Sequence, residues 1–344
     1  MKHYNIPIFV PHKGCPFDCV FCNQKHITGN TDEVNEEKIV EIIEEYLKTL
    51  PKQDCIIEAA FFGGSFTGIE MDMQKKFLST AYEYVKKGKI HGIRLSTRPD
   101  YISIPILEQL DKYGVTTIEL GVQSLDNEVL LKSGRGHKEE AVYNAVSLIR
   151  KYDFNLGLQM MTGLPGDDNE KALCTADKII GLKPDFVRIY PTLVVKDTYL
   201  EKMFLSGEYK PQSVEDAVEL CKKLLIKFKH AGIEVIRISL QTTDEISPGG
   251  SIVAGPFSDQ FRELVESSIY FDEFCKILKD YKGKNAVIFV NTKDISKAIG
   301  RKKINIKKID DIYNIKIKIK GTDEIKKGDF YLSDGVEREE SDCI

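Results

Sequence analysis

Short apolar runs rich in β-branched residues alternate along this chain with stretches whose apolar residues recur at helical spacing. The first run, residues 6–10, is followed by apolar positions such as Ile39 and Ile43 at the spacing of an amphipathic helix. Asn35 is a suitable N-cap for this helix, and Glu36 opens an acidic first turn, where the helix dipole favours negative charge. The pattern therefore predicts a strand and then a helix.

The same alternation repeats five more times. The predicted pairs of strand and helix are residues 56–62 and 73–85, 92–96 and 104–112, 116–121 and 138–151, 155–161 and 170–182, and 185–190 and 213–230, followed by a last strand at 234–238. Strand–helix units in series imply a parallel sheet with helical crossovers. The strands are apolar on both faces, as a sheet covered by helices requires.

Glycines and polar residues gather at the carboxyl ends of these strands. They are Gly63-Gly64-Ser65, Ser96-Thr97-Arg98, Gly121-Val122-Gln123, Gly163-Leu164-Pro165 and Tyr190-Pro191. In βα-barrels, the loops at the carboxyl ends of the strands build the active site. The sequence therefore predicts an α/β fold, a partial (β/α)6 TIM-like barrel with a small C-terminal α/β module, and a site on that rim.

The chain is acidic overall but basic near its end. It has 344 residues, 42% hydrophobic and 30% charged, with a net charge of −4, whereas residues 293–320 alone carry about +7. This asymmetry suggests a separate basic module. The expected domains are a core barrel with its extension at residues 1–283, the basic module at 284–320 and a polar tail at 321–344.

The expected location is the cytoplasm. No apolar run approaches the ~20 residues that cross a bilayer, and the first residues lack the long apolar core and the cleavage site of a signal peptide.

Three of the eight cysteines lie within residues 15–22. A tight cysteine cluster in a large chain indicates metal or redox chemistry rather than a disulfide framework. Two interpretations compete. An iron–sulfur cluster would take the thiolates of Cys15, Cys19 and Cys22 and keep one iron open, whereas a structural zinc site would add His26 as a fourth ligand.

The cysteine motif, with Phe21 before the last cysteine, resembles the signature of the radical S-adenosylmethionine superfamily. Five further segments match that family in the same order: residues 60–66, 94–100, 119–125, 134–137 and 158–166. The resemblance implies a [4Fe–4S] cluster, S-adenosylmethionine as cofactor, and its reductive cleavage to a 5′-deoxyadenosyl radical. It also implies the partial barrel and favours iron over zinc.

Within the superfamily, residues 1–270 are most similar to the catalytic subunit of Elongator and more distantly to oxygen-independent coproporphyrinogen oxidase. Residues 96–100 and 189–194 carry the Elongator likeness. The family's acetyltransferase domain is not expected here, because few residues follow the barrel and they contain no Gly-rich acyl-coenzyme A loop. The cysteine spacing is also the common short form. The resemblance therefore does not extend to the acetyl-dependent reaction.

The resemblance also implies roles for individual residues. Cys15, Cys19 and Cys22 would be the catalytic metal ligands. The expected cofactor contacts are Phe21 on adenine, Gly63 and Gly64 on the methionine amino group, Arg135 on its carboxylate, and Gln123. Ser96 and Gln159 stand where related enzymes have acids that contact the cofactor. Candidate substrate contacts at the barrel mouth are Arg98, Asp100, Tyr190 and Lys196.

The basic module resembles a KH RNA-binding motif. A strand at 286–291 and a pair of helices precede a second strand at 314–319, and the loop between the helices would be Gly300, Arg301, Lys302 and Lys303. In KH modules a G-x-x-G loop clamps the nucleic-acid backbone. The second glycine is absent here, and the added lysine could contact phosphate. The alternative is a small α/β cap with a solvated lysine face.

These observations favour a radical S-adenosylmethionine enzyme that acts on a nucleobase of RNA, with tRNA as the expected class. Reduced flavodoxin or ferredoxin is the expected electron donor. Two alternatives stay open: radical chemistry on a small molecule such as a porphyrin or a sugar, and a non-catalytic RNA-binding protein with structural zinc.

Overall fold

The computed structural model describes residues 2–10, 15, 19–23, 34–240, 246–247 and 249–333. The chain divides into two compact units. Residues 1–217 and 224–259 form the first unit, and residues 218–223 together with the chain from Gln260 onward form the second. The predicted boundary after residue 283 lies inside the second unit, because helix α10 (Phe261–Leu278) packs into its core.

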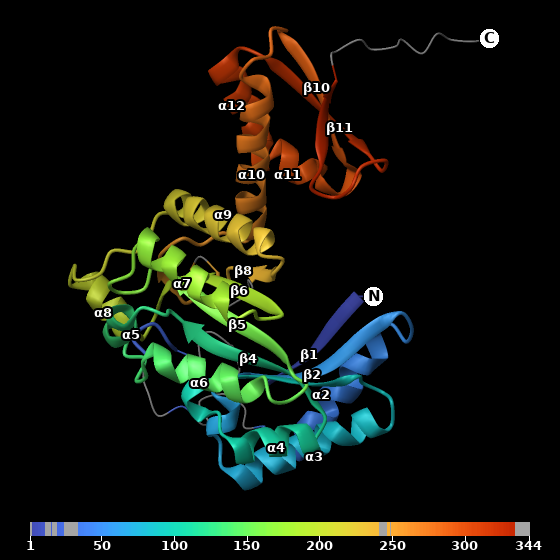
Figure 1. Cartoon of the computed structure of the whole chain (residues 1–344), viewed down its shortest axis with the longest axis vertical. Helices are drawn as coiled ribbons and strands as arrows, with labels where there is room; N and C mark the ends of the chain where they lie inside the picture. Colours follow the sequence, from blue (N-terminus) through green and yellow to red (C-terminus); the bar gives the residue numbers. More distant parts are fainter. Residues whose placement is uncertain are drawn as a thin grey trace. The chain divides into compact units, whose positions relative to one another are not determined.

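The first unit is built on one parallel sheet of seven strands, which follow one another across the sheet in chain order (Figure 1). The strands are β1 (Lys2–Val10), β2 (Cys55–Gly63), β3 (Gly92–Thr97), β4 (Val115–Gln123), β5 (Asn155–Thr162), β6 (Phe186–Pro191) and β8 (Glu234–Ile238). The sheet curls into a half barrel. The predicted α/β fold with a partial barrel is therefore confirmed.

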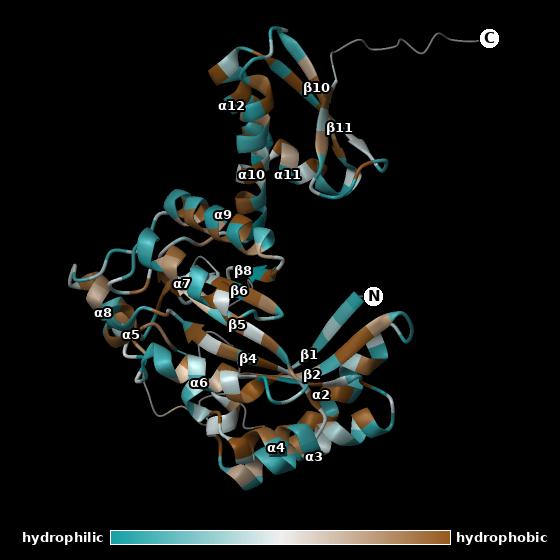
Figure 2. Cartoon of the chain, viewed as in Figure 1, coloured by the Kyte–Doolittle hydropathy of each residue, from teal (hydrophilic) through white to brown (hydrophobic). Residues whose placement is uncertain are grey.

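Helices connect the strands. Polar and apolar residues are interspersed along these helices, as Figure 2 shows for α3 and α9. The main crossovers are α2 (Glu36–Thr49), α3 (Met71–Lys86), α4 (Ile104–Lys112), α6 (Glu139–Ile149), α7 (Asn169–Gly181) and α9 (Val214–His230). The side chain of Asn35 caps α2 by accepting a 2.8 Å hydrogen bond from the Lys38 amide. No described helix is long and apolar enough to cross a membrane.

Several short elements were not predicted. They are the 3₁₀ turns η1 (Phe66–Gly68) and η2 (Pro99–Tyr101), helices α5 (Asn127–Lys132) and α8 (Tyr199–Leu205), and the antiparallel pair β7 (Val194–Val195) and β9 (Ile252–Ala254). Elements this short carry too few turns to produce a recognisable period.

One face of the sheet carries a ladder of buried charges, although its strands read as apolar runs. Glu119 on β4 is fully buried. Its carboxylate lies 3.1 Å from Nη2 of Arg94 on β3 and 2.6 Å from Nε of Arg188 on β6. Arg188 Nη2 also donates to the other carboxylate oxygen at 3.0 Å. A buried carboxylate is stable only when its charge is paired in this way.

The ladder continues to Glu58 on β2. Arg94 Nη1 lies 3.4 Å from the Glu58 carboxylate, and Nε2 of His3 on β1 lies 2.7 Å from it. Burial would raise the pKa of Glu58, but hydrogen bonds from His3 and Thr116 and the charge of Arg94 bring that pKa below its usual range. The ladder therefore ties β1, β2, β3, β4 and β6 together through side chains as well as backbone.

Gly157 on β5 makes room for this ladder. A Cβ at this position would lie 2.3 Å from the Phe186 ring and 3.1 Å from Cγ of Glu119. The Phe186 ring in turn lies beneath the Arg94 guanidinium, 5.3 Å from its centroid. The missing side chain thus lets an aromatic ring and a carboxylate approach the strand closely.

The second unit is a three-stranded sheet with helices on one face. Its elements after α10 are β10 (Asn285–Asn291), η3 (Thr292–Asp294), α11 (Ile295–Ile299), η4 (Arg301–Lys303), α12 (Ile304–Tyr313), β11 (Lys316–Thr322) and β12 (Phe330–Ser333). The central strand β10 pairs in parallel with β11 and antiparallel with β12. Strand β12 falls within the segment predicted as a tail.

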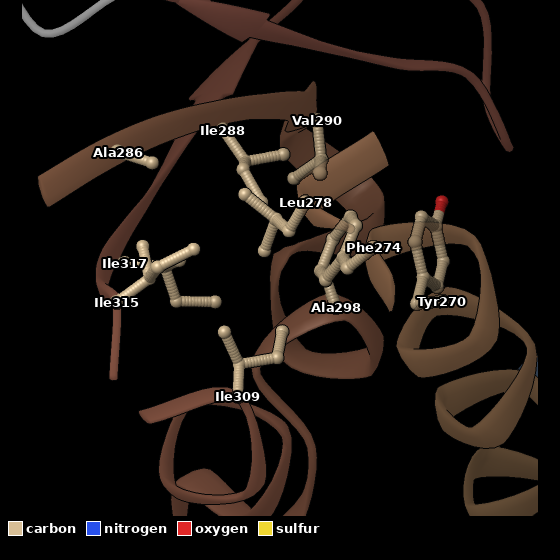
Figure 3. Packing of buried hydrophobic residues seen from close by; sticks show 10 residues of the cluster. All are labelled: Tyr270, Phe274, Leu278, Ala286, Ile288, Val290, Ala298, Ile309, Ile315 and Ile317. Atoms are coloured by element: carbon tan, nitrogen blue, oxygen red, sulfur yellow. The ribbon is translucent and has the colours of Figure 1, made fainter. Parts of the chain in front are cut away.

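Figure 3 shows the core of this unit. Ile288 and Val290 of β10 pack against Phe274 of α10, Ala298 of α11 and Ile309 of α12. The three helices therefore cover the same face of the sheet.

We predict that Glu119→Gln lowers the free energy of unfolding by about 3–5 kcal/mol, because the substitution leaves buried Arg188 without its counter-charge and Arg94 with Glu58 alone. Urea unfolding of the full chain measures this. The matched control is Glu128→Gln, which removes an exposed carboxylate paired with Lys132 and Lys171. This variant should unfold at nearly the same urea concentration as the wild type, because exposed ion pairs add little stability. Equal losses of stability in the two variants would contradict the central role of Glu119 in the charge ladder.

Candidate active site

The described part of the cysteine segment, residues 19–23, is tied to the barrel by backbone contacts on both sides. The Val20 amide donates to the Ser133 carbonyl at 3.1 Å, and the Val20 carbonyl accepts from the Leu200 amide at 2.7 Å. The Asn23 side-chain amide donates to the Lys196 carbonyl at 3.2 Å. The segment is therefore held between the turn after α5 and the start of α8.

The three cysteines differ in exposure. Cys19 is 5% exposed, whereas Cys15 and Cys22 are half-buried. The Cys22 amide donates to the Cys19 carbonyl at 2.9 Å, which closes a tight turn. Within the described residues, no three His, Cys, Asp or Glu side chains lie close enough together to hold a metal ion. His26, the predicted zinc ligand, lies outside the described residues.

A cationic group lies directly beside this segment. Arg135 is buried, and its Nη1 approaches Cys19 Sγ at 3.5 Å. Its Nη2 donates to the Gly121 carbonyl. A Cβ on Gly121 would lie 3.0 Å from Nη2 of Arg135 and 3.1 Å from the Gln123 side-chain nitrogen. The glycine at this strand end thus lets the guanidinium reach the backbone of β4.

Arg135 is supported from its other side by an ion pair. Arg98 Nη2 donates to the Arg135 carbonyl at 2.6 Å, and the Arg98 guanidinium forms a two-pronged pair with Asp100 at 2.9 Å. Burial lowers the pKa of Arg98, but Asp100, with smaller contributions from Cys19 and Cys15, raises that pKa above its usual value. Arg98 and Asp100 were predicted as substrate contacts. In the structure they support the backbone of Arg135, whose side chain lies beside Cys19.

Three buried polar atoms near this point have no hydrogen-bond partner among the described residues: Oε1 of Gln123, Nε of Arg135 and Nε2 of His137. Burial and the charge of Arg135 lower the pKa of His137, so its ring is neutral at pH 7. Gln123 also has a φ of +67°, an uncommon conformation for a side-chain-bearing residue. Buried polar atoms and local strain of this kind are typical of a site that receives a polar ligand.

The glycines after β2 border the same edge of the sheet. Gly63 has a φ of +111°, and the Gly64 amide donates to the carbonyl of Val10, the last residue of β1, at 3.0 Å. Close beyond them, the Ser65 and Thr97 hydroxyls lie 2.8 Å apart, and the Arg98 amide donates to the Ser65 hydroxyl at 3.1 Å. These bonds hold the ends of β1, β2 and β3 together.

The other predicted cofactor contacts, Ser96, Gln159 and Phe21, have different neighbours. Ser96 stands opposite Glu119 in the register of β3 and β4. The Gln159 amide nitrogen donates to the Glu119 carboxylate at 3.0 Å, so this side chain belongs to the charge ladder. Phe21 packs beside the small cluster of Val20, Val194, Leu200 and Tyr209. The cofactor roles of these residues remain predictions.

Tyr190 and the loop after β5 complete the rim. Tyr190 is the second-last residue of β6, and burial raises the pKa of its hydroxyl. In the loop, Asp167 accepts a 2.8 Å hydrogen bond from the Gly163 amide, and the Tyr209 hydroxyl donates to the Gly163 carbonyl at 2.6 Å. Burial raises the pKa of Asp167 to about 6 despite the hydrogen bonds to its carboxylate.

Sequence reasoning missed Glu119, Arg94, Arg188 and Asp167. A signal for the first three was present, because a charged residue inside an otherwise apolar strand needs a buried partner. Their pairing depends on the register of neighbouring strands, which the periodicity of one strand does not give.

The predicted RNA-binding loop lies in the second unit. Gly300 has a φ of +72°, and Lys302 and Lys303 have φ values of +53° and +60°. Arg301, Lys302 and Lys303 are all exposed. Two consecutive lysines in the left-handed region at the start of α12 are an uncommon arrangement that stores strain.

Comparison with known proteins places most of the chain in two family domains. Residues 9–179 match the Radical SAM superfamily, and residues 184–270 match the Radical SAM C-terminal domain.

The similar proteins include the tRNA uridine(34) acetyltransferase of Methanocaldococcus jannaschii, which is 32% identical over 184 residues, 48% of this chain and 34% of that protein. Elongator complex protein 3 of Homo sapiens is 31% identical over 201 residues, 53% of this chain and 37% of that protein. The structure of the archaeal Methanocaldococcus infernus Elp3 with an N-terminal deletion has a TM-score of 0.61 and 26% identity, and covers 79% of this chain and 63% of that chain. The match spans little more than a third of the curated relatives. The predicted likeness to the catalytic subunit of Elongator is confirmed.

We predict that Asp167→Asn stabilises the protein at alkaline pH. In the folded state Asp167 ionises near pH 6, whereas an unfolded aspartate ionises near pH ~4. Between these values the unfolded chain binds fewer protons, so the stability of the wild type falls as pH rises and stays reduced above pH ~6. Thermal unfolding from pH 4 to 8 should show a gain of about 1 kcal/mol at pH 8 that vanishes near pH 4. The exposed control Asp153→Asn should show no such trend, and a pH-independent gain at Asp167 would refute the assignment.

Proposed function

Because the chain belongs to the radical S-adenosylmethionine superfamily, we propose that it holds a [4Fe–4S] cluster on Cys15, Cys19 and Cys22 and cleaves S-adenosylmethionine to modify a nucleobase of RNA, tRNA being the expected class. The main supporting observation is that Cys19 lies beside Arg135 at the edge of the sheet. Gln123 and His137 present buried polar atoms without hydrogen-bond partners at the same edge. Three thiolates suit such a cluster, and the polar atoms suit a zwitterionic cofactor.

The reduced cluster would supply one electron that cleaves the bound sulfonium and yields the 5′-deoxyadenosyl radical. The protein's own residues hold and orient the reactants. The Arg135 guanidinium lies close to Cys19 Sγ, and hydrogen bonds to ligand sulfurs are among the factors that set the reduction potential of a cluster. Arg98, held by Asp100, fixes the backbone of Arg135.

The cofactor would lie along the carboxyl ends of the strands. Gly63 and Gly64 let a ligand approach the backbone after β2 closely, as glycine does at such positions. The unpartnered Oε1 of Gln123 is an acceptor that suits an ammonium group, and the unpartnered Nε of Arg135 is a donor that suits a carboxylate. Phe21, at the cysteine turn, would contact the adenine.

Two observations support RNA as the substrate. The relatives include proteins named tRNA uridine(34) acetyltransferase, and the second unit presents an exposed basic loop at residues 301–303. The acetyl transfer in the name of those relatives is not carried over to this chain, because the match leaves most of their length uncovered. Reduced flavodoxin or ferredoxin would deliver the electron.

We predict that Cys15→Ala, Cys19→Ala and Cys22→Ala each abolish formation of 5′-deoxyadenosine, because three thiolates are needed to hold a four-iron cluster with one open iron. The measurement uses protein reconstituted with iron and sulfide without oxygen, then reduced and given S-adenosylmethionine. The control is Cys174→Ala, since Cys174 is exposed on α7. Colourless protein that holds one zinc and yields no deoxyadenosine would overturn the cluster assignment.

We predict that the combined variant Arg301→Gln, Lys302→Gln and Lys303→Gln binds tRNA at least tenfold more weakly at 0.1 M salt, because each phosphate contact releases counterions. A salt titration should show a slope reduced by up to about 3. The matched control replaces Lys76, Lys87 and Lys112, exposed lysines at helices α3 and α4, with the same loss of charge. Equal weakening in both triple variants would show a general charge effect and exclude a role for the loop.

A further inference from the structure

The face of the first sheet that carries the charge ladder also carries aromatic side chains near its rim. Side chains of a strand alternate between the two faces of a sheet. Phe62 therefore shares the face of Glu58, which precedes it on β2, and Tyr190 shares the face of Arg188, which precedes it on β6. Both aromatic residues stand closer to the carboxyl ends of their strands than these ladder residues do.

Phe9 adds a third ring to this face. Asn5, earlier on β1, accepts a 3.1 Å hydrogen bond from Arg94 of the ladder, and the alternation of side chains then assigns Phe9 to the same face as Asn5. Phe9 also stands next to Phe62 in the parallel register of β1 and β2. We call Phe9, Phe62 and Tyr190 the aromatic layer.

The curl of the sheet brings distant parts of this face together. Phe62 on β2 and Arg188 on β6 are separated by three strands, yet the guanidinium carbon of Arg188 lies 6.0 Å from the centroid of the Phe62 ring. In a flat sheet these two strands would be about 19 Å apart. The aromatic layer therefore faces the enclosed side of the half barrel, between the ladder and the strand ends.

The rings of the aromatic layer are not fully covered by the folded chain. Phe61, on the opposite face of β2, is 1% exposed and packs against Phe66 with ring centroids 4.9 Å apart. Phe9, Phe62 and Tyr190 are each half-buried, and within the described residues none of the three forms a ring pair with another aromatic side chain. Phenylalanine is among the residues most often fully buried, so the open ring surface here indicates contact with a ligand.

The Tyr190 hydroxyl has a proton to offer such a ligand. Burial raises the pKa of Tyr190, and a hydrogen bond from Arg188 opposes this rise only in part, so the hydroxyl is neutral at pH 7. A guanidinium can only donate, so the oxygen of Tyr190 is the acceptor in that bond. Within the part of the chain that the structure describes, the hydroxyl proton is donated to no protein group.

We propose that the aromatic layer stacks a nucleobase of the RNA substrate, and that the Tyr190 hydroxyl donates a hydrogen bond to a carbonyl oxygen of that base. Every base has a π-face, and stacking on aromatic side chains is a main source of affinity for unpaired bases. Enzymes that act on a base take it out of its own stack, so an enclosed aromatic surface suits the extruded base. A hydroxyl donor favours bases with a carbonyl group, such as uracil and guanine, over adenine.

The inference rests on the proposed function for its choice of RNA, and it adds the residues that would hold the target base. A base on the aromatic layer would lie between the ladder and the strand ends, where the cofactor is proposed to bind. The basic loop at residues 300–303 belongs to the second unit and has no part in this site.

The test is photo-crosslinking of the full chain, reconstituted with iron and sulfide and kept oxidised, to a mixture of tRNA transcripts. In one preparation 4-thiouridine replaces uridine, and in the other 6-thioguanosine replaces guanosine, so that the two carbonyl bases are distinguished. After irradiation with long-wavelength ultraviolet light, peptide mass spectrometry should find crosslinks at Phe9, Phe62 or Tyr190 with one of the two probes.

Three variants show whether the rings hold the base. Phe62→Leu should lower the crosslinked fraction about tenfold, because leucine is apolar but has no π-face. Tyr190→Phe keeps the ring and removes the donor, and should lower this fraction about threefold. The matched control Phe61→Leu makes the same change on the opposite face of β2 and should leave the fraction unchanged. Circular dichroism checks that each variant is folded.

Crosslinks confined to the second unit, or equal losses in Phe61→Leu and Phe62→Leu, would overturn the inference. So would crosslinks at the aromatic layer that disappear when S-adenosylmethionine is added, because the adenosyl group would then occupy the layer. The proposed radical step fails separately, through the absence of 5′-deoxyadenosine. Crosslinks at the aromatic layer in such a protein would leave this inference standing.

Discussion

The buried carboxylate of Glu119, held between Arg94 and Arg188, is the interaction on which the rest of the first unit depends. A sheet that curls into a half barrel brings the side chains of its strands close together on one face. Charges placed there need partners from other strands, because isolated buried ions are unstable. The ladder from His3 to Arg188 provides these partners. It therefore couples the folding of five strands to one polar interior.

The same strand connects this floor to the site. Along β4, Glu119 lies in the ladder, Gly121 accepts Arg135 through its carbonyl, and Gln123 ends the strand in a left-handed conformation. These residues occupy every second position of β4 and so share one face of the sheet. A shift of one residue in the register of β4 would therefore remove all three from the interior. The ladder thus fixes the register that places Arg135 beside Cys19. Stability and site geometry here have a common origin.

The sequence was sufficient for the strand–helix alternation, since apolar periodicity reports the face that each element buries. Helix α4 and strand β8 lie at the residues predicted for them, and Asn35 caps α2 as expected. The spacing of the cysteines indicated metal or redox chemistry, and their role as cluster ligands stays a prediction. The pairing of Glu119 with two arginines could not be predicted from the sequence, because it depends on three strands far apart in the chain. Likewise, α10 belongs to the second unit, but its amphipathic pattern does not reveal which core it joins.

The charge of the chain is unevenly distributed. Residues 293–320 of the second unit carry about +7, whereas the whole chain carries −4, so all other residues together, including the acidic end of the chain, carry about −11. On the proposed function, an RNA substrate would be attracted mainly by the basic segment at residues 293–320, because phosphate contacts dominate affinity and respond steeply to salt. The first unit holds the buried cation Arg135 beside Cys19. On this division, salt would weaken RNA binding strongly while leaving the buried ladder intact, because buried pairs are screened far less than exposed ones.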